Sequence, residues 1–265
     1  MQVEDLVAVL SAFTNSSSLN KVKTEDEYRL FDSPLVGFAD ANDDLFCQLK
    51  LQSAVGPQHL TPSEWLPGAQ TVISFFLPFS SRVRTSNRTA GEPSLEWLYG
   101  RIEGQAFVVE FGRFLVSLLQ QQEHQAIFPT IDPRFNIIHR RSNWSERHVA
   151  FIAGLGTISL NRSLITKSGS AGRLGSVITN RRLPASERYY SAFDENCNHC
   201  GACIRRCPPG AINEDGKDHA LCDAYLETMK QRFSPRYGCG KCQTGVPCEQ
   251  AIPARRFAKG AHSGN

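Results

Sequence analysis

Apolar residues recur at helical spacing in two long stretches of the chain. The first stretch covers residues 1–13, where the apolar positions are Val3, Leu6, Val7 and Leu10. The second covers residues 98–122 and gives the strongest helix prediction in the chain, because apolar residues continue at three- and four-residue spacing. Its expected core-facing residues are Leu98, Ile102, Ala106, Val109, Phe114 and Leu118. Both stretches are therefore predicted to be helices that pack on a core.

Shorter apolar runs predict strands. "PLVGFA" at 34–39 and "RLGSVIT" at 173–179 are typical of short buried strands, and "TVISFFLPF" at 71–79 is apolar enough to be buried on both faces. A further helix is predicted over 145–156, with Ser145 as its cap and glycines at its end. This mixture predicts an α/β (α+β) fold, in which the order of the strands is not determined.

Composition narrows the class of protein. The chain has 265 residues, of which 41% are hydrophobic and 21% are charged, as in a globular protein with one or two domains. The net charge of +3 is too small to argue for a nucleic-acid partner. No apolar run reaches membrane-spanning length and no secretory signal is recognisable, so we expect a cytoplasmic protein without a membrane partner.

The nine cysteines are distributed unevenly. Cys47 stands alone in the first 196 residues and is expected to be a buried structural thiol, whereas the other eight lie between 197 and 248. We therefore place a domain boundary at residue 185, with one unit over 1–185 and a metal-bearing unit over 186–265. A disulfide framework would need export, which the sequence does not indicate.

The segment "CNHCGACIRRCPPGAI", residues 197–212, carries the most specific motif of the chain. Its spacing, C-x₂-C-x₂-C-x₃-C-P, is that of bacterial ferredoxins, in which three thiolates bind one 4Fe–4S cluster and the fourth binds a second cluster. Zinc would require paired C-x-x-C knuckles, which this spacing does not supply. His199 lies inside the motif and is expected to be a loop residue rather than a ligand.

Two clusters need eight thiolates, and the sequence provides eight. Cys207 requires three partners from elsewhere, which Cys222, Cys239 and Cys242 can supply. Cys248 then completes the first set. The predicted sets, which the spacing favours without forcing, are Cys197, Cys200, Cys203 and Cys248 for one cluster, and Cys207, Cys222, Cys239 and Cys242 for the other.

The stretch "LCDAYLE…YGCGKCQTGVPC" that follows the motif, together with "SERHVAFIAGLGTISLNRSLITKSGSAGRLGSVIT" at 145–179, resembles the epoxyqueuosine reductases. These are cobalamin-dependent iron–sulfur enzymes related to reductive dehalogenases. The resemblance implies a nitroreductase-like N-terminal α/β domain that holds cobalamin, followed by a ferredoxin-like domain with two 4Fe–4S clusters, partitioned as above. It also implies that the clusters feed electrons to cobalt.

The resemblance also suggests residues that contact the cofactor, namely Arg140, Ser142, Gly154 and Gly156. For Gly154 and Gly156, the resemblance implies the wall of a corrinoid pocket, and an ordinary helix terminus explains the two glycines equally well.

Three departures from the family pattern bear on activity. Arg140 occupies the position where the family has its catalytic aspartate, Pro247 precedes Cys248 instead of following it, and the sequence lacks the helical-repeat extension of many members. The sequence therefore predicts an iron–sulfur reductase that is related to epoxyqueuosine reductase but does not share its reaction. Its catalytic residues are not identified.

Two functional hypotheses remain open. The first is an oxidoreductase in which a low-potential donor, such as ferredoxin or flavodoxin, reduces the clusters and then a corrinoid that acts on a small molecule. The second is an electron-transfer or corrinoid-reducing accessory protein without substrate chemistry of its own. Flavin in the N-terminal unit is a further alternative to cobalamin.

Overall fold

A sheet of four antiparallel strands forms the centre of the molecule. The computed structural model describes residues 2–254. The strands lie in the order β3-β4-β10-β5, and each neighbouring pair is antiparallel. Their bounds are Leu35–Asp40 for β3, Thr71–Pro78 for β4, Ala126–Ile127 for β5 and Gly172–Thr179 for β10. The three strands predicted from the sequence and the mixed α/β fold class are confirmed.

Helices and short hairpins surround this sheet. The helices are α1 (Val3–Ser16), α2 (Asp44–Gln48), α3 (Pro62–Trp65), α4 (Ser81–Ser86), α5 (Leu95–Gln120), α6 (Glu146–Ile152), α7 (Ala202–Arg205) and α8 (His219–Phe233). The short strands pair as β1 (Lys21–Val22) with β2 (Tyr28–Arg29), β6 (Ile137–Ile138) with β7 (Arg141–Ser142), β8 (Gly156–Ile158) with β9 (Leu164–Thr166), and β11 (Ile212–Asn213) with β12 (Gly216–Lys217). The helices predicted at 1–13, 98–122 and 145–156 are confirmed as α1, α5 and α6.

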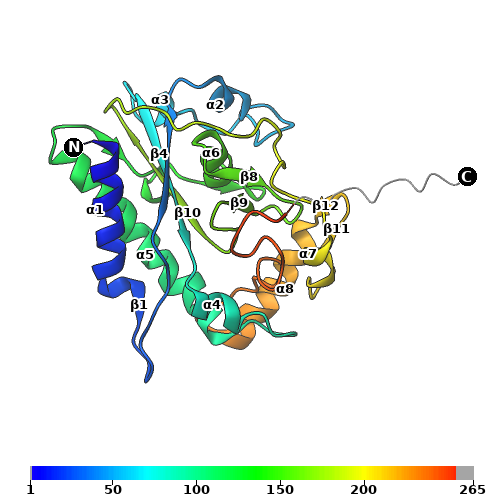
Figure 1. The fold of residues 1–265 in the computed structure, drawn as a ribbon. Coiled ribbons are helices and arrows are strands. Elements are labelled where there is room, and N and C mark those ends of the chain that lie inside the picture. The colour runs from blue at the N-terminus through cyan, green and yellow to red at the C-terminus, as the bar shows by residue number, and fades with distance from the viewer. Residues whose placement is uncertain (1, 255–265) are drawn as a thin grey trace, which may run out of the picture.

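Strand β4 is buried on both faces because helices cover both sides of the sheet. Helices α1 and α5 lie on one side, and α6 lies on the other (Figure 1). All eight residues of β4 are buried. Phe75 packs in the cluster beneath α5, whereas Val72 packs with Trp65 and Val149 on the opposite face. The expectation of a strand with two buried faces is therefore confirmed.

Helix α5 turns a different face to the core than its apolar spacing predicted. The buried positions are Trp97, Leu98, Gly100, Gly104, Phe107, Val108, Phe111, Gly112, Leu115 and Leu119. Of the six expected residues only Leu98 is buried, and Ala106 is exposed. A Cβ atom on Gly112 would lie 2.2 Å from the Phe128 ring, and one on Gly104 would lie 2.9 Å from the Phe31 ring. The helix therefore packs closely through glycines, which the count of apolar residues did not include.

The C-terminal segment docks on the N-terminal part through buried polar contacts. The segment after α8, red in Figure 1, runs between the β8–β9 hairpin and α8. Its Glu249 is 3% exposed and accepts two hydrogen bonds from Arg88. The buried Lys241 donates to the carbonyls of Asn87 and Thr89 at 3.2 and 2.8 Å. The loop of residues 87–89 therefore fixes the position of the second cysteine-rich turn.

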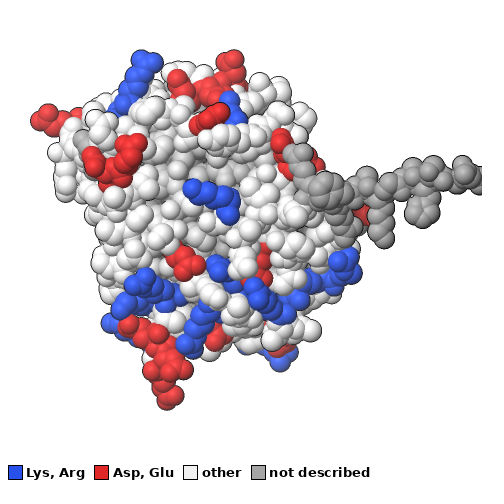
Figure 2. All heavy atoms as spheres, viewed as in Figure 1, with Lys and Arg blue, Asp and Glu red and all other residues white. Residues whose placement is uncertain are grey.

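Charged side chains of both signs share the visible surface. In Figure 2, Lys and Arg side chains gather over the part of the molecule where α4 and α8 lie, with acidic side chains among them. Such mixing does not form the continuous positive field that binding to a nucleic-acid backbone requires on this face. None of the helices in the described part is both long and apolar enough to cross a bilayer.

Candidate functional site

The first predicted cysteine set surrounds a small hollow. Cys197, Cys200, Cys203 and Cys248 all line it, although Cys248 follows the other three by 45 residues or more. Burial raises the pKa of the Cys248 thiol to about 11, and the nearby thiolates of the other three raise it further. The Ser170 hydroxyl donates to the Cys248 sulfur at 3.8 Å. The structure thus brings these four sulfurs together from two ends of the C-terminal segment.

The second set lines one wall of a much larger cavity, of about 610 Å³. Cys207 follows α7, Cys222 lies on α8, and Cys239 and Cys242 lie on the turn that packs against α5. Burial raises the pKa of Cys242 to about 12, and that of Cys239 also rises with burial. Lys217 carries the nearby positive charge, since burial would lower its pKa but the Cys242 and Cys222 thiolates raise it.

The donor chemistry of both sets suits iron–sulfur clusters. Each set offers four soft sulfur ligands, the number that one 4Fe–4S cluster takes. Among residues 2–254, no three Cys, His, Asp or Glu side chains are arranged around a single point as one metal ion would require. A cluster binds each thiolate at a different iron, whereas zinc needs all four sulfurs at about 2.3 Å from one atom.

Glycines allow the second cysteine turn to approach α5. Gly240, between Cys239 and Lys241, has a φ of +66°, and a Cβ atom there would lie 1.9 Å from the Trp97 ring. A side chain at this position would therefore push the Cys239–Cys242 turn away from the helix.

His199 lies in the loop of the first set, where its ring forms a hydrogen bond with Asp194 at 2.9 Å, as expected of a loop residue.

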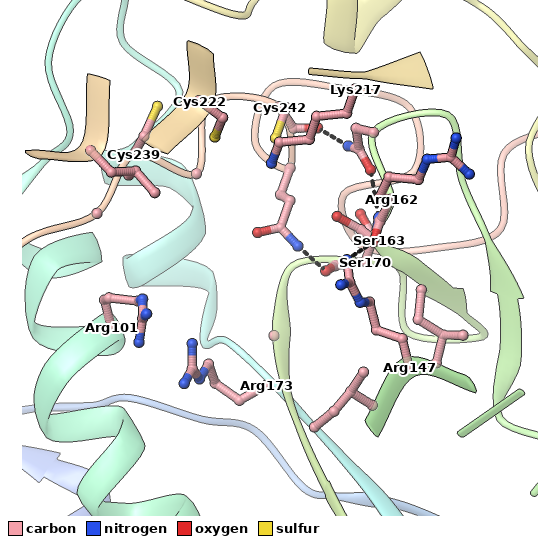
Figure 3. Close-up of a pocket in the computed structure, with 18 of the residues that line it drawn as sticks. Arg101, Arg147, Arg162, Ser163, Ser170, Arg173, Lys217, Cys222, Cys239 and Cys242 are labelled. Carbon is pink, nitrogen blue, oxygen red and sulfur yellow. Dashed lines mark hydrogen bonds between the residues drawn. The ribbon is translucent and has the colours of Figure 1, made fainter. Parts of the chain in front are cut away.

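The cavity beside the second set is rich in positive charge. Arg101 projects from α5 and Arg173 from β10, while Arg147, Arg162 and Lys217 lie on its other side (Figure 3). A second cavity of about 700 Å³ shares part of this wall. The shared residues are Ser142, Ser145, Arg147, Arg162 and Lys217. The two cavities therefore adjoin and can hold a large ligand between them.

Glu146 supplies the acidic group of the cysteine-lined cavity. Its two carboxylate oxygens accept hydrogen bonds from Thr130 Oγ1 at 2.8 Å and from Ser176 Oγ at 2.6 Å. The Ser176 oxygen in turn accepts from the Trp144 indole at 2.8 Å. Burial raises the pKa of Glu146 to about 7, which the two hydroxyl donors only partly oppose. Glu146 therefore holds a proton near neutral pH, next to the cysteines.

Burial lowers the pKa of two histidines near the site, His59 and His148, to about 4, with smaller contributions from neighbouring positive charges. His59 is fully buried and stacks on Trp144, and His148 bonds Ser145 Oγ at 2.7 Å. His148, His139 and His219 line the second cavity, but no histidine of the described chain lines the cysteine-lined one.

The structure separates the four residues that the resemblance had suggested for cofactor contact. Ser142 lines both cavities. Arg140 lines only the second, at the tip of the β6–β7 hairpin, where it is exposed and pairs with Asp223 at 2.5 Å. Its side chain therefore lies at the surface, and its partner Asp223 directly follows Cys222 of the second cysteine set on α8.

Gly154 and Gly156 are not among the described residues that line either large cavity. A Cβ atom on Gly154 would lie 2.9 Å from the Glu187 carbonyl, and one on Gly156 would lie 2.1 Å from the Ile165 carbonyl. Gly154 therefore ends α6, whereas Gly156 is the first residue of β8, and the missing side chains let the backbone pack closely at both positions. Cys47 was expected to be buried, which is wrong: it is exposed on the short helix α2.

Several cavity residues were not predicted from the sequence. They are Arg101, Glu146, Arg162, Arg173 and Lys217. A signal was present for Arg173, since a charged residue at the start of an otherwise apolar strand needs a polar environment. No comparable signal marked Arg101, whose helix is charged at many positions.

No protein-family model matches the chain. Among curated proteins, it is 29% identical to the epoxyqueuosine reductase of Bacillus cereus over 198 residues, which is 70% of this chain and 50% of that protein. The chain spans about half the length of this relative and of the epoxyqueuosine reductase of Bacillus anthracis. The sequence resemblance to epoxyqueuosine reductases is therefore confirmed.

Solved structures with the same fold include an epoxyqueuosine reductase with an epoxyqueuosine-modified tRNA-Tyr stem loop. The TM-score is 0.54 at 22% identity, over 94% of this chain and 66% of that one. A catabolic reductive dehalogenase gives a TM-score of 0.56 at 15% identity, over 83% of this chain and 30% of that one. The chain therefore shares the fold of these solved structures, which is consistent with the fold class predicted from the sequence.

Proposed function

We propose that the chain is an iron–sulfur oxidoreductase that passes electrons through two 4Fe–4S clusters to a corrinoid in the cysteine-lined cavity. The observation that carries this proposal is the position of Cys207, Cys222, Cys239 and Cys242 in one wall of that cavity. A cluster there would be adjacent to any molecule the cavity holds. The similarity to epoxyqueuosine reductases and to a reductive dehalogenase supports the same chemistry.

The two parts of the chain have different roles. Residues 186–265 hold the clusters, and residues 1–185 supply the sheet and helices that form the rest of the cavity. The first cysteine set lies beside the exposed side chain of His199, where a low-potential donor such as ferredoxin or flavodoxin can approach. Electrons then move from the first set to the second and to the cavity.

A bound corrinoid would supply one-electron chemistry at cobalt. Ser142, Arg147 and Arg162, in the wall that both cavities share, would bind its polar periphery. Glu146 Oε1 or Oε2 would deliver a proton to a reduced small molecule, since burial raises its pKa to about 7 and so leaves part of it protonated near neutral pH. No part of this requires Arg140 at the reacting atoms.

A corrinoid held in the cysteine-lined cavity would take no nitrogen ligand from the protein, because no described histidine lines that cavity. We infer that cobalamin would bind there in the base-off form, so titrating the protein with cob(II)alamin should shift its EPR spectrum to that form. Coupling to an axial nitrogen would contradict this, because the nitrogen would then come from cobalamin's own base or from a histidine of the second cavity, His139, His148 or His219. An unchanged spectrum together with a purified flavin would favour a flavin enzyme.

We also propose that this protein does not reduce epoxyqueuosine efficiently. Loss of the epoxide oxygen needs a proton donor, and general acid catalysis is worth about 10²–10⁴-fold in rate. The family's acid is replaced by Arg140, a guanidinium that stays charged and is tied to Asp223 at the surface. Turnover of epoxyqueuosine-containing tRNA at the rate of a family enzyme would contradict this proposal, and activity gained by Arg140→Asp would support it.

The departure at Arg140 also favours, as the second candidate, an electron-transfer or corrinoid-reducing accessory protein. In that case the reduced cofactor would serve a partner, and no small molecule would be turned over. Stopped-flow reduction of added cob(II)alamin distinguishes the two when it is followed with and without candidate small molecules. Reoxidation that depends on a small molecule identifies an enzyme.

The cluster assignment is tested by anaerobic reconstitution and metal analysis of three variants. Wild-type protein should bind about eight irons, the sum of two four-iron clusters. Cys248→Ala should impair the cluster of Cys197, Cys200 and Cys203, and Cys222→Ala should impair the other. Cys47→Ala is the matched control, since this exposed thiol belongs to neither set. Stoichiometric zinc with no iron after anaerobic preparation would refute the proposal.

A further inference from the structure

Two arginine side chains converge at the inner end of the cysteine-lined cavity. Arg101 comes from α5 and Arg173 from β10, and Figure 3 shows both guanidinium groups in the same space. Enclosure by protein, and after it the neighbouring charge of Arg101, lower the pKa of Arg173 to about 9. The two guanidinium groups therefore repel each other across the cavity.

Neither arginine has an anionic partner in the described part of the chain. Arg101 donates to the Tyr237 hydroxyl at 3.0 Å and stacks on its ring, and Arg173 donates to the amide oxygen of Gln105. The carboxylate nearest in sequence, Glu103, pairs with Arg236 at 2.5 Å. An enclosed charge is costly unless an opposite charge compensates it. The pair is therefore an incomplete ion-binding site.

The other cationic side chains of the cavity also lack an anionic partner among the described residues. Arg147, Arg162 and Lys217 form no salt bridge with any described carboxylate, although the cavity brings all of them together with Arg101 and Arg173. These five cations face a single carboxyl group among the lining residues, that of Glu146, and an excess of one charge in a concave surface concentrates its field on the occupant. The cavity therefore favours a negatively charged ligand.

The two arginines are not needed to balance the negative charge of the cysteine thiolates. The positive neighbour that stabilises the Cys242 thiolate is Lys217, and that of Cys239 is Lys241. The charge next to Arg173 is that of Arg101, whose hydrogen-bond partner is the Tyr237 hydroxyl rather than a carboxylate. The charges of the second cysteine set are thus provided for without Arg101 or Arg173.

We propose that Arg101 and Arg173 bind the oxyanion, a phosphate or carboxylate, of a small molecule that occupies the cysteine-lined cavity. The planar guanidinium forks match the geometry of such oxygens and form charge-assisted hydrogen bonds to them. This names the substrate class, and its role as a substrate rests on the proposed function. The binding itself requires only the arginines and the cavity.

The test is isothermal titration of the anaerobically reconstituted full chain with two probes, inorganic phosphate and benzoate. Wild type should bind at least one of them. Arg173→Gln and Arg101→Gln should each weaken that binding by at least about tenfold, since charge-assisted hydrogen bonds exceed the roughly 1.4 kcal/mol that tenfold represents. Arg113→Gln is the matched control, because Arg113 lies exposed on the same helix. Its affinity should equal that of wild type.

The two probes distinguish the ligand classes, since preference for phosphate indicates a phosphate-bearing molecule and preference for benzoate a carboxylate. The proposal is overturned if wild type binds neither probe, or if all four proteins bind with the same affinity. It is also overturned if Arg173→Gln changes only the cluster reduction potential. Iron content of the same samples reports separately on the proposed function, because anion binding by an iron-free chain would refute the clusters and retain the arginine site.

Discussion

Replacing Glu146 by glutamine should stabilise the protein at alkaline pH and change little at acid pH. The carboxyl group lies among protein atoms at the cavity wall, and burial raises its pKa from 4.5 to about 7. Below pH 4.5 the group is protonated in both the folded and the unfolded chain. As the pH rises from 4.5 to 7, the unfolded chain releases the proton and the folded protein retains it, so stability is lost across this window.

The size of the effect follows from the rise in pKa. At about 1.4 kcal/mol per pH unit, a rise from 4.5 to about 7 corresponds to about 3 kcal/mol of stability lost above pH 7. The carboxyl group also faces the cavity, where solvent lowers the free-energy cost of its charge. We therefore expect the variant to be more stable than wild type by about 1–3 kcal/mol above pH 7. Glutamine mimics the protonated acid, because it can still accept from Thr130 and donate to Ser176.

The assay is anaerobic urea unfolding of reconstituted protein, followed by circular dichroism between pH 5.5 and 8.5. The difference in stability between Glu146→Gln and wild type should grow in favour of the variant from pH 5.5 to about 7, the pKa of the group in the folded protein, and level off above it. Any loss from the altered hydrogen bonds does not depend on pH, so it shifts the whole curve without changing its slope. Glu25→Gln, at an exposed position, should give a flat difference. A flat difference for Glu146→Gln as well would refute the raised pKa.

Two further predictions concern the cysteine-rich segment. Gly240→Ala should destabilise the protein by more than about 2 kcal/mol in urea unfolding and lower the iron content of the second set, because its Cβ atom would overlap the Trp97 ring. Gly91→Ala is its control, since Gly91 also has a positive φ but no atom within 4 Å of the added carbon; an equal loss in both variants would show that backbone strain alone is responsible. Removing iron with a chelator should increase hydrogen exchange mainly beyond residue 190, because eight buried thiolates lose their common partners; uniform exchange over the whole chain would contradict this.

The sequence by itself determined the elements whose signals are local. The apolar run of 71–79 made β4 a strand with two buried faces, and the glycine at 154 ended α6 as a glycine with positive φ does. The cysteine spacing predicted which thiols share a set, because a C-x₂-C-x₂-C-x₃-C-P loop is too short for its fourth sulfur to reach the first cluster. The described structure places four of these cysteines at each of two cavities, and which thiols share a cluster stays a prediction.

Only the tertiary structure decided which surfaces these elements present to one another. Helix α5 turns Gly104 and Gly112 to the core because large rings on other elements fill the space that their missing side chains leave. Arg101 and Arg173 are 72 positions apart, and they meet only because α5 packs across β10. Arg140 holds a family position in the sequence, yet the β6–β7 hairpin carries it to the surface. Residue spacing determines which contacts residues close in sequence can make. The charge of a cavity depends on contacts between segments that are distant in sequence, and no local pattern predicts these contacts.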